Sequence, residues 1–141
     1  MAEHVASSIV GFVRAVVEAE PFTLTPTQTP YGFDLQPADN VDGTYRLVPA
    51  TYRAIGALNF YETRFDTFDL WFARAHGGDT TATLDGLMLT CTSLVAAIAR
   101  EGIVRDYDLM DEGRGSEVAM APGQSFALAR ITLPLSYAAR L

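Results

Sequence analysis

The chain has 141 residues, of which 49% are apolar and 19% are charged, and its formal net charge is −7 at pH 7. This length and composition indicate one domain, spanning residues 1–141, and exclude a chain that is disordered as a whole. The acidic balance argues against binding nucleic acid through its phosphates and against binding an anionic membrane, because both need clustered basic side chains. No apolar run approaches the roughly 20 residues of a membrane span, so we expect no membrane contact.

Residues 2–20 are predicted to form the first helix, because apolar side chains recur there at helical spacing and Pro21 ends it. Residues 21–42 are predicted to be a long loop, since four prolines alternate with threonines and such a segment favours extended, solvated backbone that cannot join a central sheet. A loop of this length in a small domain is usually functional or disordered. Its second half contains an alternating apolar set that we expect to dock on the domain or on a partner: Tyr31, Phe33 and Leu35.

Residues 44–48 are predicted to form a short strand that Pro49 ends. From residue 51 to residue 75, apolar and polar side chains alternate. This alternation predicts either two long strands with a turn near residues 62–66, or one bent strand with a bulge. Two glycines after His76 break the pattern.

The clearest single element is an amphipathic helix between Asp79 and Gly102. Its apolar residues recur at three- and four-residue steps: Leu84, Leu87, Met88, Cys91, Leu94, Val95 and Ile98. These residues form one stripe, which we expect to be buried. Asp79 or Thr80 is predicted to cap the start, and Gly102 is predicted to adopt the left-handed conformation that ends many helices. Cys91 is the single cysteine, and its place on the stripe predicts a buried thiol and not a catalytic one.

Three more strands are predicted after this helix, at residues 103–110, 118–121 and 126–137, with turns at residues 111–115 and 122–124. In the last strand the odd-numbered residues from 127 to 137 are apolar and face one way. Pro134 lies inside this strand, so that end is expected to lie at an edge of the sheet or to lack a partner.

These elements predict an α+β fold of two layers, in which both helices pack on one face of a mostly antiparallel β-sheet. The opposite face of the sheet then carries Trp71, together with Phe126 and Leu128. An exposed apolar patch of this kind would need a partner.

The densest polar cluster comprises Asp106, Asp108, Asp111 and Glu112. Runs rich in carboxylates can hold Ca²⁺ or Mg²⁺, but the spacing of a calcium-binding loop is absent. If the segment is a strand, Asp106 and Asp108 share one face. We interpret the cluster as a solvated strand end and turn, with an acidic face that serves an interface as the alternative.

The remaining polar residues give no catalytic pattern. His4 and His76 are not at a spacing that suggests zinc, and no serine lies in a nucleophile elbow. Residues 77–81 precede a helix but lack the Gly-Lys-Ser/Thr ending of a phosphate-binding loop, so a helix cap is the better interpretation. We therefore predict no catalytic residue, no metal site and no cofactor, and we expect that the protein is not an enzyme.

The order of the elements resembles the tail terminator family of long-tailed bacteriophages and gene transfer agents. Residues 54–75 correspond to a long hairpin, residues 81–100 to the amphipathic helix, and residues 103–141 to the closing strands. Within the closing strands, Tyr107-Asp108 before an acidic turn and Ile131-Thr132-Leu133 resemble the closing hairpin of the family. The Thr/Pro-rich loop departs from the family's pattern.

The resemblance implies a structural virion protein at the head-proximal end of the tail, assembled in the host cytoplasm. It implies a ring of six subunits that caps the tail tube, stops its polymerisation and contacts the tail tube protein and the head–tail connector. DNA would pass through the ring without being read, and an acidic protein suits this because like charges prevent sticking. A cyclic ring needs two different complementary patches on each subunit. Candidate interface residues are Tyr31, Phe33, Leu35, Trp71, Asp106, Asp108, Asp111 and Glu112.

Two other functions fit the same sequence. One is a head–tail connector or head-closure protein, which also forms rings. The other is a small-ligand-binding module or enzyme that uses a cavity between the helices and the sheet.

Overall fold

The computed structural model describes residues 6–26, 42–58, 61–75, 78–120 and 126–140. These residues form two helices and a mixed, mostly antiparallel sheet of six strands, which confirms the predicted α+β fold. The elements in chain order are α1 (Ala6–Glu18), β1 (Thr25–Pro26), β2 (Thr44–Leu58), β3 (Tyr61–Ala75), α2 (Thr80–Val104), β4 (Asp108–Leu109), β5 (Gly115–Met120) and β6 (Phe126–Arg140). The strand order is β1-β2-β3-β6-β4, with β5 also paired to β6, and β1 is parallel to β2.

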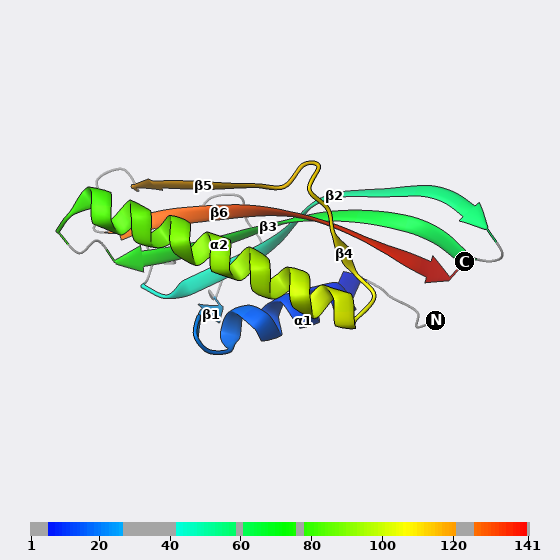
Figure 1. The fold of residues 1–141 in the computed structure, drawn as a ribbon, viewed down its shortest axis with the longest axis horizontal. Helices are drawn as coiled ribbons and strands as arrows, with labels where there is room; N and C mark the ends of the chain where they lie inside the picture. The colour runs from blue at the N-terminus through cyan, green and yellow to red at the C-terminus, as the bar shows by residue number, and fades with distance from the viewer. Residues whose placement is uncertain (1–5, 27–41, 59–60, 76–77, 121–125, 141) are drawn as a thin grey trace.

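Three long strands form the centre of the sheet. β2, β3 and β6 have 15 residues each, so each is about 50 Å long. β2 and β3 form an antiparallel hairpin, and β6 pairs with β3 from Phe126 opposite Ala75 to Arg140 opposite Tyr61. In Figure 1, these strands extend past the ends of both helices on the side where the C-terminus lies. We call this projecting end, which contains Leu58 of β2, Tyr61 of β3 and Arg140 of β6, the arm.

The predicted turn near residues 62–66 is wrong. These residues lie within β3 and pair with strands on both sides. Pro49 does not end a strand either, because β2 continues through it with an irregularity in register before Thr51. A proline is tolerated at such a bulge, where the regular ladder of hydrogen bonds is already interrupted.

Both helices lie on the same face of the sheet, as predicted (Figure 1). The odd-numbered residues of β6 from Ala127 to Tyr137 are buried against them, which confirms the predicted alternation. α1 begins at Ala6 and ends at Glu18, and residues 2–5 lie outside the described part of the chain. Its buried residues are Ile9, Phe12, Val13 and Val17.

The predicted stripe on α2 is buried in its central positions. Leu87, Cys91, Leu94 and Ile98 contact the core, whereas Leu84 and Val95 are half-buried at its margin. Met88 is exposed, which differs from the prediction, because it lies about 100° around the helix from Leu87. Burial raises the pKa of the Cys91 thiol to about 11, in agreement with the predicted structural role.

Asp79 caps the start of α2, as predicted. Its carboxylate oxygen accepts a hydrogen bond from the backbone N–H of Ala82 at 3.1 Å. This contact satisfies one of the N–H groups that the first turn of a helix leaves without a helical partner.

Gly102 is not the left-handed residue at the end of α2. The helix continues to Val104, and Asp106 is left-handed with a φ of 62°. The N–H of Tyr107 donates to the carbonyl of Gly102 at 2.8 Å, which is the long hydrogen bond of a Schellman motif. Gly102 instead has a close backbone neighbour: a Cβ atom there would lie 3.0 Å from the backbone oxygen of Tyr107, which is tighter than most Cβ contacts.

The strand predicted at residues 103–110 is reduced to β4, because α2 and its cap occupy the first part of that segment. The strand predicted at residues 118–121 is β5 and begins earlier, at Gly115, so the predicted turn at residues 111–115 ends before that glycine. The predicted turn at residues 122–124 lies outside the described residues. β6 extends the predicted strand to Arg140.

Pro134 has a strand partner on one side of β6 only, so the prediction holds at Pro134 itself, but it is wrong for the next two residues, which pair with both β3 and β4. Pro134 pairs with Thr67 of β3, whereas neither β4 nor β5 has a residue in register with it. The N and O atoms of one residue in an antiparallel strand point to the same side. Since the Pro134 oxygen accepts from Met110 on the β4 side at 2.9 Å, its nitrogen also faces that side, where no strand needs a donor.

Candidate interaction surfaces

The four acidic candidates lie along the segment that follows α2, and all four are exposed. Asp106 occupies the left-handed position after the helix and Asp108 lies in β4, so the expected common strand face is wrong. Asp111 forms an ion pair with Arg114 at 3.2 Å, and Glu112 lies in the adjoining turn. Among the described residues, no group of three or more His, Cys, Asp or Glu side chains is placed to hold a metal ion.

Trp71 lies on the sheet face opposite the helices, as predicted. The guanidinium of Arg130 covers its ring, with 5.5 Å between the Arg130 Cζ atom and the ring centroid, and also pairs with Glu117 of β5. The pairing of β3 with β6 places Phe126 and Leu128 on the same face, and both are half-buried. This face is therefore a partly covered, mixed surface, and the other candidates on the loop, Tyr31, Phe33 and Leu35, lie outside the described residues.

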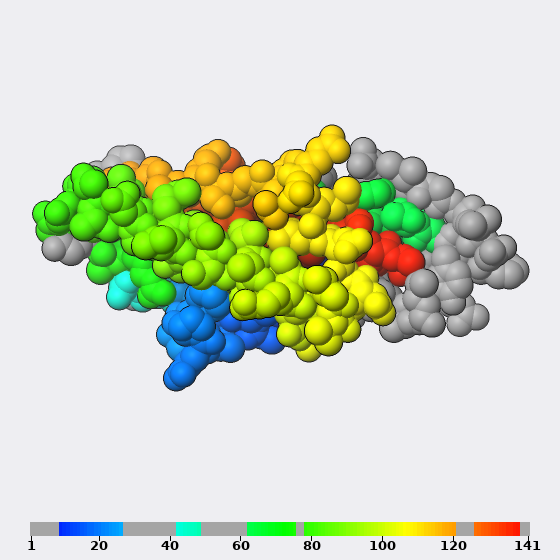
Figure 2. Space-filling view, viewed as in Figure 1, coloured from blue at the N-terminus to red at the C-terminus, as the bar shows by residue number. Residues whose placement is uncertain are grey.

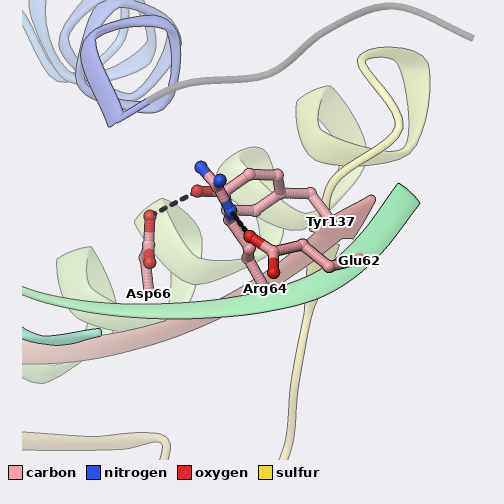
Figure 3. A network of polar contacts seen from close by, with 4 residues as sticks. All are labelled: Glu62, Arg64, Asp66 and Tyr137. Carbon is pink, nitrogen blue, oxygen red and sulfur yellow. Dashed lines mark hydrogen bonds and ion pairs between the residues drawn. The ribbon is translucent and has the colours of Figure 1, made fainter. Parts of the chain in front are cut away.

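A polar network that was not predicted from the sequence lies where the arm meets the helices (Figure 3). Glu62, Arg64 and Asp66 alternate along β3 and so share the face toward the helices. The Tyr137 hydroxyl donates to Asp66 Oδ2 at 2.7 Å, and Arg64 Nε donates to Glu62 Oε1 at 2.6 Å. Asp66 is only 5% exposed. Burial, and then the hydrogen bond to Asp66, raise the pKa of Tyr137.

Aromatic contacts connect this network to both helices. Tyr107, directly after α2, stacks on Phe12 of α1 with 5.0 Å between ring centroids. It also meets Tyr137 of β6 edge to face at 5.5 Å. The chain Phe12–Tyr107–Tyr137–Asp66 thus links α1, the end of α2, β6 and β3. These buried groups hold the arm in a defined position relative to the helices.

Two shallow grooves flank α2. One lies between its first turns and the end of β3, and the other lies between its second half and the end of α1. Neither groove is lined by a histidine or a cysteine. The first is lined mostly by small and polar side chains, and the second adds Arg100 and Glu101. They do not bring together the pattern of a nucleophile and its base.

The side of α2 that faces away from the sheet forms much of the surface seen in Figure 2. Leu89 is 69% exposed and Ile103 is 72% exposed. No charged residue lies between Asp85 and Arg100. In the described part of the chain, α2 is the one helix whose length and composition would suffice to cross a membrane, and 22% of its apolar window is buried. We had expected no apolar stretch long enough to span a membrane, and α2 differs from this expectation in length and composition.

No protein-family model matches the sequence, and a search of curated proteins finds no match. Function is therefore inferred from the fold and from the surfaces described above.

Proposed function

We propose that the chain is a structural subunit of a tail-terminator-type ring. In this function it binds copies of itself, the tail tube protein and the head–tail connector, at the head-proximal end of a virion tail. The order of elements agrees with the resemblance: a helix, a hairpin of long strands, an amphipathic helix and closing strands. The observation that carries the proposal is the arm.

The arm is longer than the helical layer that covers the sheet. α2 has 25 residues and is about 37 Å long, whereas the three central strands are about 50 Å long. A sheet in water is stable when one of its faces is covered by another layer. A three-stranded arm that continues past both helices therefore supports contact with a second chain, as expected in an assembly.

The network at the base of the arm supports the same function. Tyr137, Asp66 and Tyr107 are buried and connect the arm to both helices. An element that must meet a neighbour at a fixed angle has to be held rigidly, because closure of a ring depends on that angle. The net charge of −7 agrees with a ring through which DNA passes without binding.

The proposal is tested by measuring mass and tube binding. We expect light scattering to detect particles of about six times 15.3 kDa, alone or on tubes of the tail tube protein from the same genome. Negative-stain images should show rings at the ends of tubes. Addition of the purified protein to polymerising tail tube protein should stop the tubes from growing. A strict monomer that neither binds tubes nor stops their growth would contradict the proposal, and binding to the connector alone would identify a head-closure ring.

A matched pair of substitutions tests the arm itself. Thr63 is exposed on the arm, and Thr81 is exposed in the first turn of α2. Thr63→Glu should weaken ring formation or tube binding, whereas Thr81→Glu should leave both unchanged. Equal effects of the two variants would show that the arm is not the contact. A thermal-shift screen with metals and common metabolites tests the alternative of a ligand-binding module, which predicts stabilisation that grows with ligand concentration.

A further inference from the structure

One face of α2 carries a pattern that the core does not explain. Its residues recur at steps of three and four and therefore form a single stripe on the side opposite Leu87 and Leu94. We call this stripe the outer face, and its six residues are all exposed: Asp85, Leu89, Thr92, Ala96, Arg100 and Ile103.

The outer face has opposite charges toward its two ends. Asp85 and Arg100 are 15 residues apart, which is about 22 Å along the helix. Neither side chain forms an ion pair or hydrogen bond with another residue in the described part of the chain. The stretch between them has no charge, and at its centre the Thr92 hydroxyl donates to the Met88 carbonyl at 3.1 Å. Covering Thr92 therefore leaves its donor satisfied.

We propose that the outer face pairs with the outer face of a second copy of the chain, with the two α2 helices antiparallel. A two-fold axis between Thr92 and Ser93 places Asp85 of each copy opposite Arg100 of the other. It also places Leu89 opposite Ala96, so that a large side chain meets a small one. A parallel arrangement in the same register would place Asp85 against Asp85, so the charges specify the antiparallel direction.

Charge complementarity identifies a second copy as the occupant, because Asp85 and Arg100 lie equally far from the centre of the outer face and have opposite signs. Two chains with a net charge of −7 repel each other at long range. The outer face is a surface where two copies approach without bringing carboxylates together, and its ends attract. The opposite side of α2 is held in the core by Leu87, Leu94 and Ile98, so α2 cannot enter a bilayer without losing those contacts.

This contact is isologous, because the same patch is used on both copies, and it differs from the head-to-tail contact that closes a ring. It joins two free subunits, or two rings. The inference therefore goes beyond the proposed function and does not depend on it.

The test uses charge swaps in the full chain, with mass measured by sedimentation over a concentration series. Asp85→Arg and Arg100→Asp each place like charges together at both ends of the pair. Each should weaken pairing by about tenfold or more, since two ion pairs are replaced by two repulsions. The double variant D85R/R100D should restore the wild-type mass, which is twice that of the single variants.

Leu89→Asp should also weaken pairing, and Val104→Asp is its control, because Val104 is an exposed aliphatic residue outside the outer face. Circular dichroism establishes that each variant is folded. A wild-type mass that equals that of the single variants would overturn the proposal, as would a double variant that stays weak. Flotation of an unpaired wild-type chain with phosphatidylcholine vesicles would also overturn it and would identify a membrane-binding face.

Discussion

Tyr137→Phe is expected to destabilise the fold chiefly by removing the buried hydrogen bond to Asp66, together with the contact that the hydroxyl makes with Arg64. The substitution keeps the ring and its edge contact with Tyr107 but removes the hydroxyl that donates to Asp66. Among the described residues Asp66 Oδ1 has no hydrogen-bond partner, so after the substitution neither carboxylate oxygen accepts a hydrogen bond from that part of the chain. A hydrogen bond to a charged group contributes roughly 1.5–3 kcal/mol, and a buried acceptor left without its donor costs a similar amount. We therefore expect the free energy of unfolding to fall by about 2 kcal/mol in a urea titration at pH 7.

Tyr45→Phe is the matched control. The Tyr45 ring is also buried, but its hydroxyl accepts from Arg14 Nε at 3.0 Å, and the Arg14 side chain is 48% exposed. Water can replace the lost partner there, so we expect a loss of less than about 0.5 kcal/mol. Equal losses for the two variants, or no loss for Tyr137→Phe, would refute the role of burial in this reasoning. A double-mutant cycle of Tyr137→Phe with Asp66→Asn should give a coupling of at least about 0.5 kcal/mol.

Two further predictions concern α2. Gly102→Ala should destabilise the chain by about 1–3 kcal/mol, because its Cβ would lie 3.0 Å from the Tyr107 backbone oxygen. Gly86→Ala, whose Cβ would have no atom within 4 Å, should stabilise the chain by about 0.5–1 kcal/mol. Thermal unfolding of both variants measures these changes, and a change of the same sign in both would refute the packing argument. Burial raises the pKa of Cys91 from 9.0 to about 11, so the stability that the protonated thiol contributes is complete below pH 9 and is lost as the pH rises toward 11. The free energy of unfolding should therefore fall less steeply between pH 9 and pH 11 in Cys91→Ala than in the wild type, and parallel curves would contradict this.

The sequence predicted well the elements that have one buried side. In α2 and β6 the apolar residues repeat with the period of the element, because one face of each packs on the core. This is why Cys91, Leu94 and the odd-numbered residues of β6 were placed correctly. The Asp79 cap was also predictable, since it depends on contacts within four residues.

The errors have a common physical cause, which is that contacts distant in sequence determined the local structure. Glu62, Arg64 and Asp66 are charged and resemble a turn, yet they lie in a strand because β2 and β6 pair with them and Tyr137 satisfies Asp66. Gly102 resembles a helix end, but it lies within α2, where Tyr107 passes close to it. An alternation of charged residues with period two was the one sequence signal for the network, and it is weak without knowledge of the partner strand.

Of the eight candidate interface residues, the five that the structure describes lie on the surface or are half-buried, and none of them marks the arm or the outer face of α2. The outer face was not predicted, because a stripe of apolar residues indicates only the side of a helix that packs on the core. Its informative feature is an arrangement of charge, in which Asp85 and Arg100 bracket a neutral stretch.

The arm and the outer face would serve contacts of different symmetry. A head-to-tail ring requires two patches that differ, and in the proposed ring the arm of one subunit would provide one of them, whereas a two-fold pair requires a patch that is complementary to itself. The outer face has this self-complementarity, because reversing the helix exchanges Asp85 with Arg100. The arm has a fixed direction relative to the helices, which Tyr137 and Asp66 maintain. Loss of this network should therefore disturb ring closure and leave two-fold pairing intact, so the two contacts are separable within one chain.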